Sequence, residues 1–403
     1  MNTMSKFAVF APLFPPATLG GGPIRTVKAL VDSAPQNTRA IVFTSDRDMN
    51  QTVPLQVKRN AWLERGGVSV YFGTPTSIRL LFRGLRAVRH ERPDVVYFNS
   101  FFNPSFSIVP QILGALGFWR GARVLLAPRG EFGQGALAIR ASKKRAFLTF
   151  YKAMGLHRRL LWHASSVNEE ADIRALFGER ARVLIREDET ALPPTAQRPR
   201  SASREDRPLR IVFVSRLNPM KGLDILLRSL QPISAPMVLD IFGNAEDKDY
   251  VRTCERLIRE LPTSVTCTSN GPISPEAVRA VFAEGDVFVF PTAGENFGHV
   301  IAEALSVSCP VICSNLTPWS DVLNMAGGDV LDSRDPLDWS VAIQAFAALS
   351  NEQVLGRRHA AGAAFDVWRS RDKGDHIFAQ VAQVAQVGRS PLAVKRARIY
   401  GGE

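Results

Sequence analysis

Two glutamates near the end of the chain have a spacing that could support chemistry. Glu295 and Glu303 have seven residues between them and lie between the short apolar runs 286–290 and 310–314. This order predicts a strand, a glycine-containing turn, a helix and a second strand. Glu295 then lies on a loop over the sheet, Glu303 lies on the helix, and the amides of residues 297–299 face an anion. The pattern indicates a pocket for a phosphate-bearing ligand rich in hydroxyls; two glutamates on a solvated helix face are the alternative.

Two cations follow an expected strand upstream, at residues 210–215. Arg216 and Lys221 bracket a turn that contains Pro219. A leaving diphosphate needs such a pair, because negative charge builds on its oxygens as the bond to the leaving group breaks. Arginine can hold two oxygens, whereas lysine acts as a point charge. The alternative is a loop whose charges are solvated.

A glycine run in the first half could also approach a ligand. Residues 20–22 are all glycine, follow the first expected strand and open a helix. The run does not fit G-x-G-x-x-G and no convincing ribose-binding acid follows, so a dinucleotide cofactor is not expected. A tight turn is the alternative. Asp46 and Asp48 resemble a metal-binding Asp-x-Asp pair but lack its context, so no metal site is expected.

The elements that must position these residues alternate along the whole chain. Apolar strands separated by helical stretches recur in both halves, which predicts parallel sheets covered on both faces. Residues 191–208 are rich in Pro, Ser and Arg and predict a linker. We therefore expect a first domain over 1–190, a second over 209–371, and a final segment, 372–403, with a helix that crosses back to the first domain and a basic tail.

Composition limits the class of protein. The 403 residues are 45% hydrophobic and carry a net charge of +12, which suits anionic partners. No apolar run is long enough to span a bilayer, and the sequence predicts no secretory leader, so a cytoplasmic protein is expected. Residues 139–159 hold seven basic and no acidic residues among apolar ones. They predict a basic amphipathic helix that lies on an anionic membrane or, alternatively, packs on a sheet with a solvated basic face. No nucleic-acid-binding module is recognisable.

The run Gly-Glu-Asn-Phe-Gly-His-Val-Ile-Ala-Glu-Ala-Leu, residues 294–305, resembles the Glu-x7-Glu signature of the retaining glycosyltransferases of family 4. The resemblance is most specific over residues 210–321. It implies an α/β protein with the GT-B fold, in which two doubly wound, Rossmann-like domains face each other across a cleft. The first domain then binds the acceptor and the second binds a nucleotide sugar.

The resemblance also implies roles for particular residues. Glu303 would hold the ribose hydroxyls, and Arg216 and Lys221 would stabilise the leaving diphosphate. Further donor contacts would come from Glu295 and the amides of Asn296, Phe297 and Gly298, which orient the sugar, and from the glycine loop at Gly21 and Gly22. Many members carry a histidine where this chain has Arg129 and Gly130. Arg129 or Glu131 would therefore line the acceptor side, or else be structural.

The function implied is metal-independent transfer of a sugar, with retention of configuration, from a nucleoside-diphosphate donor. The acceptor would be a hydroxyl of a glycan or polyprenyl-linked sugar, in surface polysaccharide biosynthesis, and the protein would contact the inner face of the cytoplasmic membrane peripherally. No cofactor is expected besides the donor substrate. A nucleotide-sugar 2-epimerase of the same fold and a non-catalytic nucleotide- or carbohydrate-binding protein are the alternatives.

Overall fold

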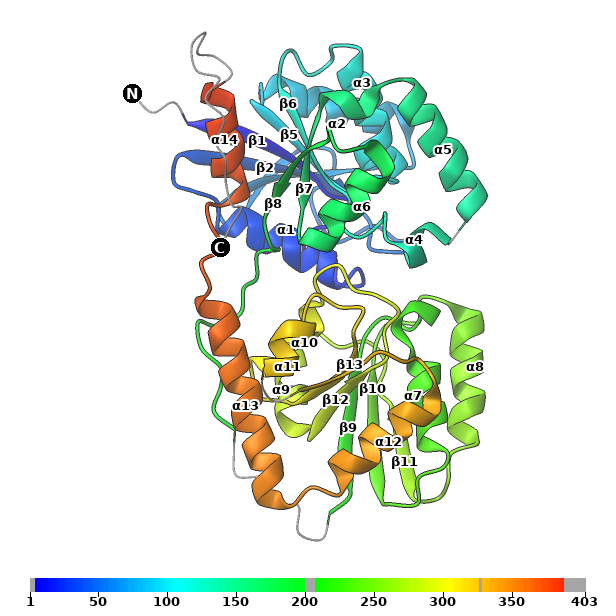
Figure 1. Cartoon of the computed structure of the whole chain (residues 1–403). Coiled ribbons are helices and arrows are strands. Elements are labelled where there is room, and N and C mark those ends of the chain that lie inside the picture. The colour runs from blue at the N-terminus through cyan, green and yellow to red at the C-terminus, as the bar shows by residue number, and fades with distance from the viewer. Residues whose placement is uncertain (1–3, 139, 200–206, 326–327, 388–403) are drawn as a thin grey trace.

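The computed structural model describes residues 4–138, 140–199, 207–325 and 328–387, which build two α/β units placed one above the other (Figure 1). In the described part of the chain, the first unit has an eight-stranded sheet of order β3-β4-β2-β1-β5-β6-β7-β8. Its strands are β1 (Ser5–Phe10), β2 (Thr38–Ser45), β3 (Trp62–Arg65), β4 (Val68–Gly73), β5 (Val95–Asn99), β6 (Arg123–Ala127), β7 (Leu160–Ala164) and β8 (Arg182–Ile185). All pairs are parallel except β3 with β4.

Helices cover both faces of this sheet, because strands such as β4 and β5 are buried along their whole length. One apolar core lies under α2, η1, α3, α5 and α6, and the other lies under α1 and α14. The helical elements of this unit are α1 (Gly22–Asp32), α2 (Ile78–His90), η1 (Pro104–Ile108), α3 (Val109–Ala115), α4 (Gln134–Ala138), α5 (Ala141–Ala153), η2 (Leu156–Arg159) and α6 (Val167–Phe177).

The second unit contains a parallel six-stranded sheet of order β11-β10-β9-β12-β13-β14 among the described residues. Its strands are β9 (Leu209–Val214), β10 (Met237–Phe242), β11 (Val265–Ser269), β12 (Val287–Phe290), β13 (Val311–Ser314) and β14 (Gly328–Leu331). Its helices are η3 (Pro219–Lys221), α7 (Leu223–Leu230), α8 (Lys248–Arg259), α9 (Val278–Glu284), α10 (His299–Leu305), α11 (Ser320–Met325), α12 (Pro336–Ala347) and α13 (Asn351–Ser370).

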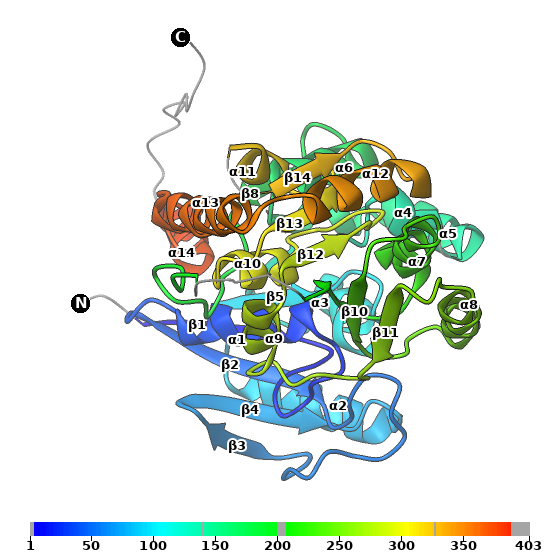
Figure 2. The same ribbon diagram turned by 90° about the horizontal axis from the view of Figure 1, so that it is seen from below.

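The chain passes between the units twice. After α13, which runs along the second unit, α14 (Ile377–Val387) lies on the first unit (Figures 1 and 2). There Phe378 is fully buried and its ring stacks on that of Phe7 at 4.1 Å. Arg186, on the outgoing crossing, donates to the carbonyls of Lys373 and Gly374 on the returning one. The two crossings are therefore tied together at the edge of the molecule.

The sequence predicts one helix over the basic segment 139–159, but the structure has two shorter helical elements there. The structure places α5 and η2 in this segment, and residue 139 lies outside the described residues. The breaks fall where the backbone is left-handed, at Arg140 (φ 55°) and Gly155 (φ 64°), and such residues interrupt a right-handed helix. The final helix is also shorter than expected, because residues 372–376 form the returning crossing. Among the described residues, no helix has both the length and the apolar character that a membrane span needs.

Candidate active site

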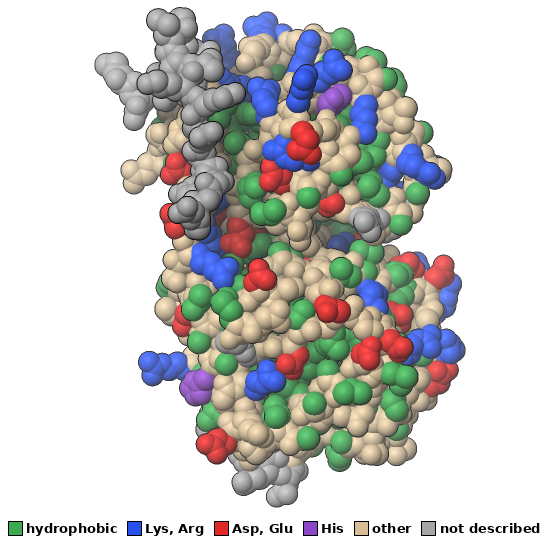
Figure 3. Space-filling view, viewed as in Figure 1, with side chains coloured by type: hydrophobic (Ala, Val, Ile, Leu, Met, Phe, Trp, Pro, Cys, Tyr) green, Lys and Arg blue, Asp and Glu red, His purple; other side chains and the backbone are tan. Residues whose placement is uncertain are grey.

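A cavity of about 950 Å³ opens between the two units, where the carboxyl ends of both sheets meet. Figure 3 shows the hollow at the boundary of the two units. Sequence-predicted residues from both units line it: Gly21, Gly22, Arg129, Gly130, Glu131, Arg216, Lys221, Glu295, Asn296, Phe297 and Gly298. Glu303 is not part of the lining; the residue is buried and lies behind the wall. The structure thus brings these predicted residues to one place.

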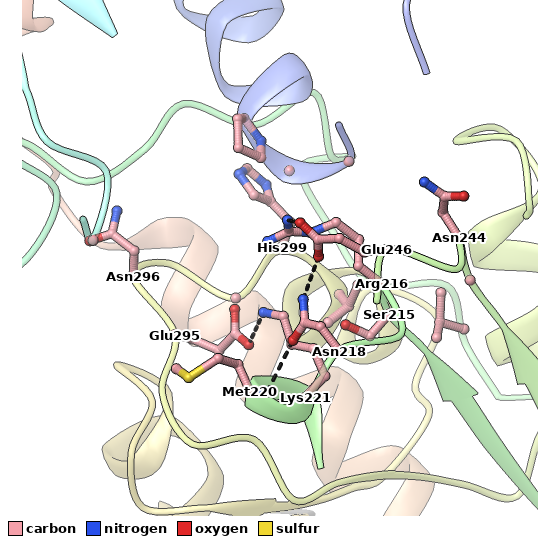
Figure 4. Close-up of a pocket in the computed structure, with 18 of the residues that line it drawn as sticks. Ser215, Arg216, Asn218, Met220, Lys221, Asn244, Glu246, Glu295, Asn296 and His299 are labelled. Atoms are coloured by element: carbon pink, nitrogen blue, oxygen red, sulfur yellow. Dashed lines mark hydrogen bonds and ion pairs between the residues drawn. The ribbon is translucent and has the colours of Figure 1, made fainter. Parts of the chain in front are cut away.

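Lys221 and Glu295 form an ion pair at the floor of the cavity (Figure 4). Lys221 Nζ lies 2.6 Å from Glu295 Oε1, and the hydroxyl of Thr292 donates to the same oxygen at 3.0 Å. Lys221 is the last residue of η3, and Gly222 follows it with a left-handed backbone (φ 73°). A Cβ at Gly222 would stand 2.1 Å from the carbonyl oxygen of Pro291, so only glycine permits this close approach of the two loops.

Arg216 lies on the same side of the cavity, directly after β9. Its NH1 donates to Glu246 Oε1 at 2.8 Å, and Asn218 donates to the other carboxylate oxygen. Asn218 also accepts from the amide of Met220, which fixes the turn between Arg216 and Lys221. Figure 4 shows Arg216, Asn218 and Glu246 grouped beside the Lys221–Glu295 pair. Glu246 was not predicted from the sequence, since it lies in another loop, 30 residues away.

Trp319 supports the loop that leads from Glu295 to α10. The indole nitrogen of Trp319 donates to the carbonyl of Phe297, and its ring packs against that of Phe297 at 5.7 Å. Gly298 adopts a left-handed conformation (φ 82°) and contacts the same tryptophan. The turn of residues 294–298 therefore has a fixed shape where it lines the cavity.

Glu303 projects from α10 toward the first unit. Arg25 of α1 reaches across and pairs through NH1 with Glu303 Oε1. The second oxygen, Oε2, is buried and has no hydrogen-bond partner among the described residues. Arg25 was not predicted from the sequence, because nothing local signals a partner 278 residues away.

His299, the first residue of α10, packs on the same part of the first unit. Its Nε2 lies 2.7 Å from the hydroxyl of Thr26 and 3.9 Å from Asp188 Oδ2. Burial and, to a smaller extent, the charges of Arg25 and Arg129 lower the pKa of His299 to about 3. The nearby Asp188 does not offset this shift, because Arg129 already pairs with it. The ring is therefore a neutral contact between the units.

Arg129 and Glu131 face the cavity, but both side chains are engaged within the first unit. Arg129 has a left-handed backbone (φ 56°), pairs with Asp188 and donates to Asn99 at 2.7 Å. Glu131 accepts from the Ser100 hydroxyl and from the amides of residues 101 and 102 at 2.7–2.8 Å. Burial raises the pKa of Glu131. An acceptor contact by either residue stays a prediction.

Asp46 and Asp48 have local partners. Asp46 accepts from the Thr74 hydroxyl at 2.7 Å, and Asp48 accepts from the amides of Thr18 at 2.8 Å and Leu19 at 3.2 Å. In the described ranges of the chain, no three His, Cys, Asp or Glu side chains are grouped so that they could hold a metal ion. Asp48 therefore fixes the loop that precedes α1, whereas Asp46 holds the residue that follows β4.

Residues 195–360 match the family of glycosyl transferases group 1. The matched segment covers most of the second unit. A D-inositol 3-phosphate glycosyltransferase from Xylanimonas cellulosilytica is 29% identical over 171 residues, which cover 42% of this chain and 40% of that protein. The corresponding protein from Mycolicibacterium smegmatis is 31% identical over 155 residues, covering 38% of this chain and 33% of its own length. The chain thus spans less than half the length of these curated relatives.

Solved structures resemble the chain over nearly its whole length. Anabaena HepE in complex with UDP and glucose aligns with a TM-score of 0.68 at 16% identity, covering 95% of this chain and 99% of that one. Sucrose-phosphate synthase from Thermosynechococcus elongatus aligns with a TM-score of 0.66 at 18% identity, covering 95% and 100%. The predicted GT-B fold is confirmed: two doubly wound units face each other across the cavity.

Proposed function

We propose that the protein is a retaining, metal-independent glycosyltransferase of family 4 that uses a nucleoside-diphosphate sugar. The observation that carries this proposal is the arrangement of Arg216, Lys221 and Glu295 around one cavity between two GT-B units. Two cations at the carboxyl edge of a sheet suit a leaving diphosphate. The match of residues 195–360 to a glycosyltransferase family, and the neighbour solved with UDP and glucose, support the same reading.

In this proposal Lys221 and Arg216 hold the diphosphate as the sugar bond breaks. Both cations are paired with carboxylates in this structure, Lys221 with Glu295 and Arg216 with Glu246. A diphosphate would share or replace these carboxylates as the partner of each cation. Glu295 and the amides of Asn296, Phe297 and Gly298 would then orient the sugar, while Gly21 and Gly22 allow the first unit to approach the phosphates.

The acceptor would enter from the first unit and attack the face of the sugar from which the diphosphate leaves. We assign it to the class of glycan or polyprenyl-linked hydroxyls, as in surface polysaccharide synthesis. The exposed side of α5 supports a peripheral membrane location: Phe150 is 53% and Met154 is 60% exposed, and lysines and arginines surround them. Figure 3 shows that basic side chains gather over the outer part of the first unit.

A thermal-shift screen with UDP-, GDP-, ADP- and TDP-sugars tests the donor class. A donor that binds the folded state raises its melting temperature by mass action, and the binder is then incubated with candidate acceptors. NMR of the product should show the anomeric configuration of the donor retained. Isomerised sugar nucleotide from donor alone would favour an epimerase, and binding without any release of nucleotide would leave only a binding protein.

A further inference from the structure

Arg25 connects the first unit to the glutamate expected to hold the ribose. Its guanidinium lines the cavity, and its NH1 pairs with Oε1 of Glu303, whose side chain is 8% exposed. The Arg25 side chain is 25% exposed, and burial lowers its pKa. A buried charge of this kind is stable only when it is paired. The contact joins α1 of one unit to α10 of the other, immediately behind the cavity wall.

Two further contacts place the same faces of α1 and α10 together. The hydroxyl of Thr26 lies 2.7 Å from His299 Nε2, and a Cβ at Gly22 would stand 2.9 Å from His299 Cδ2. His299 and Glu303 are four residues apart, so they share one face of α10. Gly22, Arg25 and Thr26 likewise stand on adjacent positions of α1. These contacts place Arg25 of the first unit next to Glu303 of the second.

The pair leaves hydrogen-bonding capacity unused. Glu303 Oε2 and Arg25 Nε are both buried, and neither has a hydrogen-bond partner in the described part of the chain. A buried polar atom without a hydrogen-bond partner lowers the stability of the fold. A carboxylate oxygen in that state can accept a hydrogen bond from a ligand. Vicinal hydroxyls of a ribose supply two such donors. The side chains of His299 and Val300, beside Glu303 on α10, line the cavity itself.

We infer that Arg25 is a positioning residue of the donor site: it fixes Oε1 of Glu303 across the domain boundary, so that Oε2 receives a ribose hydroxyl. The role rests on the donor site proposed above and adds a first-unit residue to ribose recognition. Binding of the ribose is thereby linked to the contact between the units. Arg25 should act on donor affinity rather than on the chemical step.

The experiment compares ribonucleoside diphosphates with their 2′-deoxy and 3′-deoxy forms, using the full-length protein and calorimetry. The probe is whichever of UDP, GDP or ADP binds the wild-type protein most tightly. A carboxylate–hydroxyl bond should make the weaker of the two deoxy forms bind on the order of tenfold worse. Arg25→Ala should weaken the diphosphate about tenfold and bring the deoxy ratio close to one. Glu303→Gln should lower the same ratio, and Arg25→Lys should restore part of it.

Lys28→Ala is the matched control, because Lys28 is an exposed cation on the same helix, paired with Asp32. It should leave both the affinity and the deoxy ratio at wild-type values. Melting temperatures establish that each variant is folded. In the double variant Arg25→Ala/Glu303→Gln, the loss of affinity should be clearly smaller than the product of the two single losses.

The possible results distinguish the existence of the donor site from the role of Arg25 in it. If no ribonucleoside diphosphate binds the wild-type protein, the proposed donor site fails. If wild type discriminates against the deoxy forms and Arg25→Ala keeps that ratio, Arg25 does not position Glu303. If Arg25→Ala binds the diphosphate more tightly than wild type, Arg25 competes with the ribose, and the inference is again overturned.

Discussion

Each cation that we assign to the donor faces a carboxylate across a short distance. Lys221 pairs with Glu295 at 2.6 Å and Arg216 with Glu246 at 2.8 Å. These ion pairs hold the two cations at the cavity. A bound diphosphate would compete with Glu295 and Glu246 for the same cations. An anion with two or more oxygens per phosphate can bind both cations at once, whereas each carboxylate binds one. The arrangement therefore favours a diphosphate over a single carboxylate ligand.

A prediction at this scale concerns the buried ring of His299. Its pKa is about 3 in the folded protein and about 6.5 in an unfolded chain. As the pH falls from 6.5 toward 3, the unfolded state takes up a proton that the folded state does not. This site therefore lowers the free energy of unfolding by about 1.4 kcal/mol per pH unit below 6.5.

The variant His299→Gln removes that dependence. Denaturant titrations at pH 7.0, 6.0 and 5.0 should show the stability gap between wild type and variant moving in the variant's favour as the pH falls. Other titrating groups contribute equally to both proteins, so they cancel. Parallel stability curves across this range would contradict the assignment.

A second residue-scale prediction concerns Gly130, which has a left-handed backbone (φ 75°). A Cβ there would stand 2.9 Å from Cβ of Asn296 in the other unit, whereas Gly117 (φ 82°) has nothing within 4 Å. Gly130→Ala and Gly117→Ala should both lose about 1–2 kcal/mol of stability from backbone strain. Gly130→Ala alone should lower kcat/KM for the donor, on the order of tenfold, because it displaces Asn296. Equal kinetics in the two variants would show that the contact with Asn296 has no role in the site.

At the scale of elements, the strands could be predicted more closely than the contacts between them. The apolar runs 210–215, 286–290 and 310–314 correspond to β9, β12 and β13 within one residue, and the helix expected between the last two strands is α10. Local patterns determine these, because burial on both faces requires continuous apolar residues. The antiparallel strand β3 was not predicted, since Trp62–Arg65 is short and half exposed.

The site was predictable where one motif holds its residues and was missed where partners lie far apart in sequence. Glu295, Lys221 and Arg216 follow from short motifs beside strands. The residues around them depend on tertiary packing. Glu246, the partner of Arg216, lies in the loop after β10. Arg25 and Asp188 belong to the first unit, on the opposite side of the cavity. No local periodicity encodes such pairings.

The packing of α14 gives an element-scale prediction about stability. Phe378 is fully buried against Phe7, whereas Val384, six residues further along, is 38% exposed. Phe378→Ala should lower the free energy of unfolding by about 3–5 kcal/mol. Val384→Ala, the control on the same helix, should change it by less than about 0.5 kcal/mol. Urea unfolding followed by tryptophan fluorescence measures both; a small loss for Phe378→Ala would mean that α14 is not part of the first unit's core.

The exposed face of α5 predicts binding to anionic lipid. Lys143 and Lys152 are exposed beside Phe150 and Met154. Each basic residue near an anionic surface contributes about 1 kcal/mol, so Lys143→Glu/Lys152→Glu should weaken sedimentation with phosphatidylglycerol vesicles by roughly thirtyfold or more. Binding should also fall with added salt. Arg252→Glu/Arg256→Glu on α8 changes the charge equally in the other unit and should have little effect; equal losses would indicate non-specific attraction.

At the scale of the whole molecule, the candidate active site lies in a cavity where the two units meet. The cavity takes its lining from both, and the tie between Arg186 and the carbonyls of residues 373 and 374 holds the two crossings beside each other. The central claim is that this shared cavity holds a nucleoside-diphosphate sugar whose diphosphate leaves against Arg216 and Lys221.

The release of nucleoside diphosphate from the donor tests that claim most directly. Steady-state rates are measured for wild type, Arg216→Ala, Lys221→Ala and, as a surface control, Arg252→Ala, whose side chain is 70% exposed on α8. Each of the first two variants should lower turnover on the order of a hundredfold or more with little change in KM, because their charge acts mainly as the transition state forms. Arg252→Ala should keep wild-type rates. Near-normal turnover in both Arg216→Ala and Lys221→Ala would place the diphosphate elsewhere and contradict the account.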